Sequence, residues 1–379
     1  MKWIALFLMV AMLAGCASPP AETTEATTQP ATIATTVPTE PEPTEPPDPI
    51  QLLLDAMTIE EKVGQLFLAR CDNTVALSHI QQYHLGGYVL FGRDFQDQTP
   101  DSFREKIRSY QAAADIPLLL AVDEEGGTVA RISSNRAFSD DTLPSSRDAF
   151  AWKRLEGCYT VEEAKGQLLQ SLELNVNLGP VCDMADNRSA FMYKRSIGQD
   201  AETTSQYVSG TVALMNAYGI GSCLKHFPGY GNNTDTHTGI ALDSRTLESL
   251  EERDLLPFAA GIDAGCGAIM VSHTIVQALD QELPASLSPA VHQYLREVLG
   301  FEGVILTDDL VMQAITDSYG AGEAAVLAVL AGNDLLCSTD YITQYDAVLA
   351  AVQEGRIHAE TLDSAVRNVL KWKQKLNLI

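Results

Sequence analysis

The residues best suited to catalysis are carboxylates that directly follow short apolar runs. Asp308 comes just after the run Val304–Leu306, and Asp123 closes another run that begins at Pro117. Glycoside hydrolysis needs a nucleophile or base on one side of the anomeric carbon and a proton donor on the other. Asp308 is a natural nucleophile, because a strand end fixes its position. Its neighbour Asp309 should point the other way, although alternation alone leaves open which of the two faces the site.

The candidate proton donor lies in a loop rich in Gly, Asn and Thr that runs from Gly229 to Gly239. Asp235 and His237 are two residues apart, so in an extended segment they project to the same side. The Asp235 carboxylate can then bind one imidazole nitrogen, leaving the other toward a substrate. Histidine exchanges protons near neutral pH, and a carboxylate partner stabilises its charged form. An isolated Asp-x-His sequence also arises by chance in solvated loops.

The elements that would position these residues can be predicted from the sequence pattern. Eight short apolar, β-branched runs bounded by Gly or Pro indicate strands. The predicted strands are Gln65–Leu68, Gly87–Phe91, Pro117–Asp123, Val176–Cys182, Gly221–His226, Ala268–His273, Val304–Thr307 and Asp334–Cys337. The predicted helices between them include Pro100–Ala114, Thr203–Tyr218, Leu247–Ala264, Pro289–Leu299 and Gly320–Leu330. This alternation predicts an α/β fold, a (β/α)8 TIM barrel forming a single catalytic domain. A doubly wound open sheet is the alternative.

Polar residues gather where these strands end. The third strand is followed by Asp123-Glu-Glu-Gly-Gly, the fifth by Lys225-His-Phe-Pro-Gly, the sixth by Ser272-His273 and the seventh by Thr307-Asp308-Asp309. In α/β barrels the carboxyl ends of the strands meet at one mouth, which carries the active site. Single residues of this set could simply cap helices, but their clustering favours a shared site.

Several segments together resemble glycoside hydrolase family 3, in particular its β-N-acetylhexosaminidase branch. The match runs in order from about Leu53 to Asn377. Its segments are Asp123-Glu-Glu-Gly-Gly with Arg131, Asn177-Leu-Gly-Pro-Val-Cys-Asp183, Arg195-Ser-Ile-Gly, Lys225-His-Phe-Pro-Gly, Asp235-Thr-His237, Pro284-Ala-Ser-Leu-Ser-Pro289 and Gly300-Phe-Glu-Gly-Val-Ile-Leu-Thr-Asp-Asp-Leu310.

The resemblance implies a role for each matching position. Asp308 corresponds to the family's nucleophile, and His237 with Asp235 corresponds to this branch's acid/base, which in the family's β-glucosidases is a carboxylate from a separate domain. Five residues match those that grip the hydroxyls and N-acetyl group of the terminal sugar: Asp123, Arg131, Arg195, Lys225 and His226. Ion pairs at a barrel mouth would be their alternative role. His273 also matches, and we expect it to support the site rather than react.

Two departures from the family pattern stand out. The usual run Lys-His-Phe-Pro-Gly-His-Gly-Asp has Tyr230 and Asn232 here, so a histidine and a carboxylate are missing just before the catalytic loop. The usual Arg-Ser-Phe-Gly has Ile197 as its third residue. Neither change removes a residue assigned to chemistry, but both can alter loop closure, activity or the accepted leaving group.

The N-terminus predicts export. Lys2, an apolar run too short to span a bilayer and the sequence Leu13-Ala-Gly-Cys16 resemble a bacterial lipoprotein signal. We expect residues 1–15 to be removed and the Cys16 thiol to be lipidated; an ordinary signal peptide is the alternative. Residues 16–49 are rich in Thr, Pro and Glu and predict a disordered tether. Residues 50–379 then form the catalytic barrel, outside the cytoplasm and bound to the membrane only through its lipid anchor.

Charge and cysteine content narrow the remaining choices. The formal net charge of -25 argues against nucleic acid or anionic lipid as a partner, because no basic patch would neutralise phosphates. Six cysteines follow Cys16 singly, without metal-ligand spacing, which favours buried free thiols, although export leaves one or two disulfides open. We expect a monomer that needs no metal or organic cofactor.

The expected function is that of a retaining exo-β-N-acetylglucosaminidase. Asp308 would form a glycosyl-enzyme intermediate, and His237 would protonate the leaving oxygen and then deprotonate water. The substrate would be an oligosaccharide or muropeptide: a cell-wall fragment with GlcNAc linked to MurNAc, or a chitin-like chain. One alternative is a phosphorylase that transfers the sugar to phosphate, since histidine avoids the repulsion between a carboxylate and that anion. Another is a non-catalytic sugar-binding lipoprotein.

Overall fold

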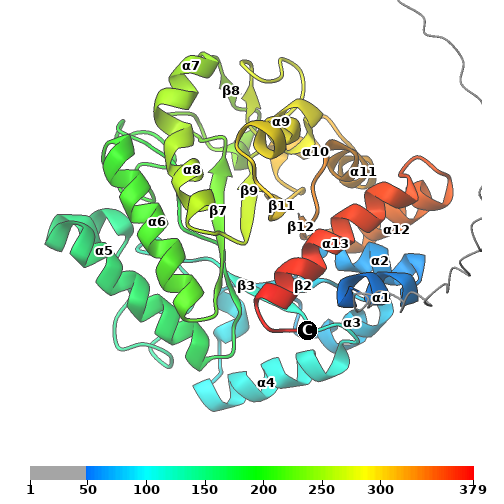
Figure 1. Ribbon diagram of the computed structural model, residues 1–379. Coiled ribbons are helices and arrows are strands. Elements are labelled where there is room, and N and C mark those ends of the chain that lie inside the picture. Colours follow the sequence, from blue (N-terminus) through cyan, green and yellow to red (C-terminus); the bar gives the residue numbers. More distant parts are fainter. Residues whose placement is uncertain (1–47) are drawn as a thin grey trace, which may run out of the picture. The chain divides into compact units, whose positions relative to one another are not determined.

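The computed structural model describes residues 48–379, and its centre is a parallel sheet of eight strands (Figure 1). The strands lie in the order β11-β9-β7-β6-β3-β2-β1-β12, and a backbone bridge between Leu306 and Leu335 nearly closes the sheet into a barrel. Their bounds are β1 Phe67–Arg70, β2 Gly87–Leu90, β3 Leu119–Val122, β6 Val176–Asn177, β7 Gly221–Phe227, β9 Ala268–Val271, β11 Val304–Thr307 and β12 Leu336–Ser338. Each overlaps a predicted strand, which confirms the (β/α)8 prediction. The open-sheet alternative is wrong.

Helices cover the outside of the sheet, including the five predicted ones. They are α1 Pro49–Ala56, α2 Ile59–Gln65, α3 Ala76–Tyr83, α4 Pro100–Ala113, α5 Ser146–Ser171, α6 Ala201–Ala217, α7 Leu247–Ser249, α8 Leu255–Asp263, α9 Pro289–Gln293, α10 Gln313–Thr316, α11 Ala321–Ala331, α12 Tyr341–Gln353 and α13 Ala359–Lys375. Helix α4 shows why they form. Thr99 caps its N-terminus, proline follows at the first turn, and Phe103, Ile107 and Tyr110 form one buried face.

Alternating side chains divide the core into an inner and an outer layer. Along β3, Leu119 and Ala121 point into the barrel, whereas Leu120 and Val122 pack outward against the helices. This strand is apolar on both faces because both are buried, as expected for a parallel sheet.

The C-terminal helix α13 contributes to the barrel interior. Its Trp372 joins the inner cluster, and a Cβ atom on Gly267 would lie 2.0 Å from the indole nitrogen, so only glycine leaves room there. In Figure 1, α13 is the red helix that runs from α12 to the C-terminus. The next residue, Lys373, is fully buried and donates its ammonium group to Gln65 at 2.7 Å. Burial lowers the pKa of Lys373 to about 7.

All six cysteines of residues 48–379 are free thiols, as the sequence favoured, and Cys337 alone among them is partly exposed. Cys16, residues 1–15 and most of the predicted tether lie outside the described residues. Within residues 48–379 no helix has the length and apolar character needed to span a membrane. Two small sheets that the sequence did not predict, β4 (Glu124–Gly126) with β5 (Val129–Ala130) and β8 (Leu242–Asp243) with β10 (Ile275–Val276), follow the main strands.

Candidate active site

A cavity of about 700 Å³ lies where the carboxyl ends of the strands converge. Seven of the eight residues predicted for chemistry or sugar binding line it, namely Asp123, Arg131, Arg195, Lys225, His226, His237 and Asp308. The eighth, Asp235, is bonded to His237. The strand-end clustering expected from the sequence is therefore confirmed.

Asp123 follows β3 and lies between two cations. Its carboxylate accepts a hydrogen bond from the Lys225 ammonium group at 2.6 Å, and Arg131 lies 3.7 Å away. Arg131 is brought back to this point by the hairpin of β4 and β5, in which Glu124 accepts hydrogen bonds from the backbone N–H groups of residues 131 and 132. Gly126 allows the hairpin: its φ is +85°, and a Cβ atom there would lie 2.2 Å from the Pro144 carbonyl oxygen.

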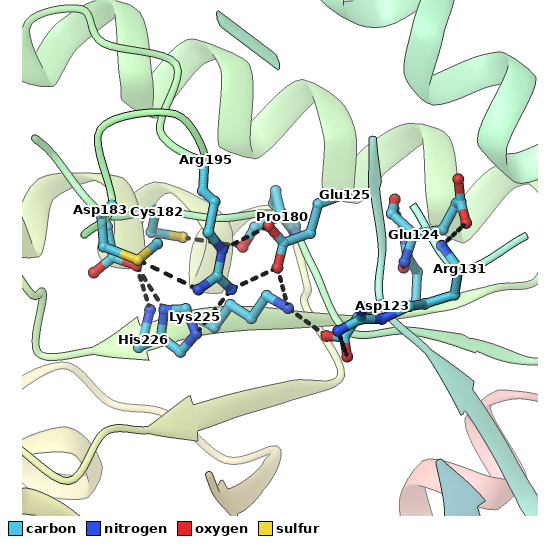
Figure 2. A network of polar contacts seen from close by, with 12 residues as sticks. Asp123, Glu124, Glu125, Arg131, Pro180, Cys182, Asp183, Arg195, Lys225 and His226 are labelled. Atoms are coloured by element: carbon cyan, nitrogen blue, oxygen red, sulfur yellow. Dashed lines mark hydrogen bonds and ion pairs between the residues drawn. The ribbon is translucent and has the colours of Figure 1, made fainter. Parts of the chain in front are cut away.

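Glu125 is the buried centre of a charge network that sequence reasoning left unassigned (Figure 2). Its carboxylate is 2.7 Å from the Lys225 ammonium group and accepts two hydrogen bonds from Arg195, at 2.7 and 2.9 Å. Burial would raise the pKa of Glu125, but Lys225 and Arg195 outweigh burial and hold that pKa well below its usual range. Glu125 therefore stays charged and fixes both cations at the edge of the cavity.

Asp183 plays a matching role for His226. Its side chain is fully buried; Oδ2 accepts from the backbone N–H of His226 at 3.0 Å and lies 2.7 Å from the imidazole Nδ1 (Figure 2). The other imidazole nitrogen, Nε2, is 3.4 Å from an Arg195 nitrogen. The carboxylate on one side and the guanidinium group on the other fix the orientation of the imidazole ring.

Asp308 leaves the end of β11 and lines the cavity. Its carboxylate accepts a hydrogen bond from the backbone N–H of Asp309 at 2.9 Å. Burial opposes its charge, but His226, His273 and this hydrogen bond outweigh burial, so the pKa of Asp308 lies below its ordinary value. A carboxylate that stays ionised suits a nucleophile.

Asp309 also borders the cavity, but its carboxylate is bound to Thr339 and to the backbone of Val311. Buried His273 supports this segment: Nε2 lies 3.0 Å from the carbonyl oxygen of Asp309, and Nδ1 lies 2.7 Å from the Ser286 hydroxyl. Burial lowers the pKa of His273 despite the nearby Asp308. The supporting position expected for His273 matches these contacts.

The loop between β7 and β8 carries Asp235 and His237. The Asp235 carboxylate lies 2.6 Å from Nδ1 of His237 and also accepts from its backbone N–H at 2.9 Å. The expected pairing is therefore present, but the extended segment used to predict it is wrong. Asp235 instead caps a short 3-10 turn, η2 (Thr236–Thr238), because its carboxylate satisfies the free N–H at the start of the turn. The turn lies against α10, across the mouth.

Tyr230 and Asn232, the two replaced residues of the first departure from the family pattern, both hold this loop, whereas Ile197 of the second is buried in an apolar cluster. Tyr230 is buried, and its hydroxyl is hydrogen-bonded to that of Thr236. Asn232 accepts from the backbone N–H groups of Asp186 and Asn187 and donates to the Asp186 carboxylate at 2.6 Å.

Taken together, the site offers an ionised carboxylate and a carboxylate-bound imidazole at one cavity. This combination suits nucleophilic attack with proton transfer to a leaving group. Glu125 and Asp183 were the functional residues missed. Both lie in segments that follow strands, which marked them as candidates. The sequence around a carboxylate does not show which distant cation or imidazole it binds.

The sequence of this chain matches known proteins over most of its described part. Residues 58–372 match the glycosyl hydrolase family 3 N-terminal domain. A β-hexosaminidase A from Pseudoalteromonas piscicida is 32% identical over 78% of this chain, which spans only 54% of that relative. A β-hexosaminidase from Xanthomonas campestris pv. campestris (strain B100) is 33% identical over 77% of this chain and 88% of its own length.

Solved structures agree with these sequence matches. A family 3 β-N-acetylglucosaminidase from Paenibacillus sp. superposes with a TM-score of 0.80 at 33% identity, covering 85% of this chain and 63% of that one. A β-N-acetylhexosaminidase from Beutenbergia cavernae has a TM-score of 0.75 at 31% identity, covering 84% of this chain and 99% of that one.

Proposed function

Because this chain belongs to glycosyl hydrolase family 3, we propose that it is an exo-acting β-N-acetylhexosaminidase that releases terminal β-linked GlcNAc with retention of configuration. The observation that carries the proposal is the pair Asp235 and His237, bonded at 2.6 Å, on a loop that brings His237 to the same cavity as Asp308.

In the first step, an oxygen of Asp308 attacks the anomeric carbon while the bond to the leaving oxygen breaks. His237 gives its proton to that oxygen, which departs as an alcohol. The result is a glycosyl-enzyme ester and a neutral imidazole.

In the second step, water attacks the anomeric carbon of the ester. His237 takes a proton from the water, and the carboxylate of Asp308 leaves. Asp235 supports both steps, because it orients the imidazole and stabilises its charged form. The side chain of His237 is 58% exposed, so it can exchange protons with solvent between turnovers.

The terminal sugar would be held by the groups that surround Asp308. Asp123, Arg195 and His226 border the cavity next to Lys225, and Arg131 completes the set. Their contacts with one another and with Glu125 and Asp183 fix the positions of donors and acceptors before a sugar arrives, which lowers the entropy lost on binding.

For the leaving group we propose an anionic cell-wall fragment, GlcNAc linked to MurNAc, rather than a neutral chitin-like chain. Arg70, Arg188 and Lys194 line the cavity, and none of them forms an ion pair with another residue of 48–379. Three uncompensated cations at the mouth of a chain with net charge -25 favour a negatively charged ligand.

Hydrolysis is tested with chromogenic β-GlcNAc and β-glucoside substrates, using Asp308→Ala and His237→Ala as controls. We expect the β-GlcNAc substrate to be preferred and both variants to lose turnover. Inactivity of the parent with intact sugar binding would favour a non-catalytic lipoprotein, and a preference for the glucoside would overturn the branch assignment. GlcNAc-1-phosphate formed when phosphate is added would indicate a phosphorylase.

The choice of leaving group is tested separately. A GlcNAc-MurNAc disaccharide should be cleaved with a higher kcat/KM than the GlcNAc dimer, and added salt should narrow that difference. Equal values at low salt would contradict the anionic substrate.

The cellular placement remains a proposal from the sequence. We propose cleavage before Cys16, lipidation of its thiol and a monomeric catalytic barrel outside the cytoplasm. Cys16→Ser should release the protein from the membrane fraction. Membrane association that persists in this variant would contradict lipid anchoring at that thiol.

A further inference from the structure

The acid/base pair stands on a loop with little regular structure of its own. Between the end of β7 and the start of β8, the described chain has only the three-residue turn η2. Such a loop holds a side chain to catalytic precision only if other contacts fix it. The position of His237 therefore depends on the few side chains that tie the loop to the barrel.

Tyr230 is rigidly held at the start of this loop. Its side chain is 1% exposed and packs in a cluster with Val181, Ala185 and Met192. Its backbone N–H donates to the buried carboxylate of Asp183 at 2.7 Å. Ring and backbone are thus both anchored to the segment that follows β6.

The ring of Tyr230 also lies beside functional residues. It meets the His226 imidazole edge to face, with ring centroids 5.3 Å apart. Phe191 lies between the loop's two rings, 5.8 Å from Tyr230 and 6.0 Å from His237. Phe191 borders the cavity as well.

The hydroxyl of Tyr230 reaches across the loop to the hydroxyl of Thr236. Thr236 is fully buried and stands between Asp235 and His237 in the chain. Burial raises the pKa of Tyr230 well above its ordinary value, so the phenol keeps its proton, and either hydroxyl of the pair can donate. A hydrogen bond at Thr236 constrains the backbone on both sides, and hence both members of the acid/base pair.

We propose that Tyr230 is a positioning residue for proton transfer, which holds the acid/base pair through Thr236. This inference rests on the proposed function. Among the described residues Tyr230 is hydrogen-bonded to Asp183 and Thr236 and to neither Asp308 nor the imidazole of His237, so it acts by fixing where His237 stands. A residue that serves packing alone would affect folding without favouring one leaving group over another.

The test uses Tyr230→Phe, which removes the hydroxyl and keeps the ring, and Thr236→Val, which removes its partner. The kcat/KM is measured on GlcNAc β-linked to 2,4-dinitrophenol, which leaves without protonation, and to an alcohol, which needs an acid. We expect kcat/KM of each variant to fall about 10- to 100-fold on the alkyl glycoside and less than about 3-fold on the dinitrophenyl glycoside. The larger loss is smaller than that expected when the acid catalyst itself is removed, because His237 is still present.

Two further readouts separate positioning from folding. Azide, a nucleophile that needs no base, should restore kcat of Tyr230→Phe on the dinitrophenyl glycoside, where breakdown of the intermediate is slow. The double variant should lose no more than either single one, because both remove the same hydrogen bond. Tyr110→Phe is the matched control: its buried hydroxyl bonds to Asn73, away from the cavity, and both substrates should be affected equally.

The outcomes are distinct. Equal losses on both substrates in Tyr230→Phe, or additive losses in the double variant, would overturn the positioning role. An inactive parent would overturn the proposed function instead. In that case hydrogen exchange still tests whether the Tyr230 hydroxyl anchors the loop. Loop amides around residues 235–238 should exchange at least about 10-fold faster in Tyr230→Phe than in the parent. Unchanged exchange would refute the anchor.

Discussion

One carboxylate oxygen of Asp183 contacts His226 at two points: it accepts a hydrogen bond from the backbone N–H at 3.0 Å and lies 2.7 Å from the ring nitrogen Nδ1. The second carboxylate oxygen accepts from the backbone of Tyr230. One buried carboxylate thus joins a sugar-binding residue to the start of the loop that carries the acid/base pair.

Replacing this carboxylate should damage folding and binding together. In Asp183→Asn, an amide N–H₂ group must face one of the N–H donors, so a buried hydrogen bond becomes a clash. We expect a loss of about 2–4 kcal/mol in the free energy of unfolding and roughly a 10-fold rise in KM. Urea unfolding and steady-state kinetics measure both. Asp140→Asn, at an exposed carboxylate with no ion pair among residues 48–379, should change neither; a stable Asp183 variant with unchanged KM would contradict the assignment.

Glu125 should matter for stability over a defined pH range. Glu125→Gln leaves Lys225 and Arg195 buried with one carboxylate fewer, which should cost about 3–5 kcal/mol near neutral pH. Because the folded pKa is depressed, the contribution is complete above the unfolded value of about 4.5 and is lost as pH falls through the folded pKa. The difference between parent and variant should therefore be flat from pH 6 to 8 and shrink below about pH 4. A difference that grows on acidification would refute the ion pairs.

The pH dependence of kcat/KM should divide the roles of Asp308 and His237. The pKa of Asp308 lies below its ordinary value, so its protonation should limit activity only below about pH 4. The alkaline limb should belong to the acid catalyst. His237→Ala should remove that limb and lower kcat/KM on an alkyl glycoside by about 10²- to 10⁴-fold. An alkaline limb that survives in this variant would assign the acid to another group.

Replacing Asn232 by aspartate should make kcat/KM depend on pH through the catalytic loop. In Asn232→Asp, which introduces the family's usual residue, a second carboxylate would face Asp186 where Asn232 now donates a hydrogen bond. That hydrogen bond is the chief reason why the pKa of Asp186 is lowered. We expect kcat/KM to fall by about 2- to 5-fold at pH 8, as an exposed like-charge pair is screened, and to recover toward pH 5. Adding Asp186→Asn to this variant should restore kcat/KM at pH 8. If the ratio of kcat/KM between variant and parent did not change with pH, the proposed repulsion would be wrong.

Lys373 should make the fold less stable at lower pH. Its folded pKa of about 7 lies below the unfolded value, so the unfolded chain binds an additional proton between the two. The free energy of unfolding should therefore rise with pH above 7, by up to about 1.4 kcal/mol per pH unit. Lys373→Met should remove this slope, which unfolding curves at pH 6, 7.5 and 9 would show. An unchanged slope would mean that the ammonium group reaches water.

The barrel was predictable because its eight strands are apolar runs separated by Gly, Pro and amphipathic helices, and each run corresponds to an observed strand. The site was predictable as a set because the carboxyl ends of parallel strands meet at one mouth. Lys225 and His226 show where the pattern stops. Successive strand residues ordinarily face opposite sides, yet both line the cavity, at a point where the register of β7 against β9 shifts.

The contacts between distant segments could not be predicted. Glu125 meets Arg195 across 70 residues and Asp183 meets Tyr230 across 47, and no local spacing encodes such pairs. Loop geometry was hidden for a different reason: the Asp235 carboxylate binds its own backbone neighbours and converts an expected extended segment into a turn.

The six thiols of residues 48–379 can report how this barrel opens. Burial raises the pKa of each of them, so the reactive thiolate is scarce while the chain is folded. An alkylating reagent therefore reaches a buried cysteine mainly when its surroundings separate. Cys223 lies in β7, Cys266 just before β9 and Cys71 next to β1, and all three are buried. The order in which these three are alkylated would show which side of the barrel comes apart first.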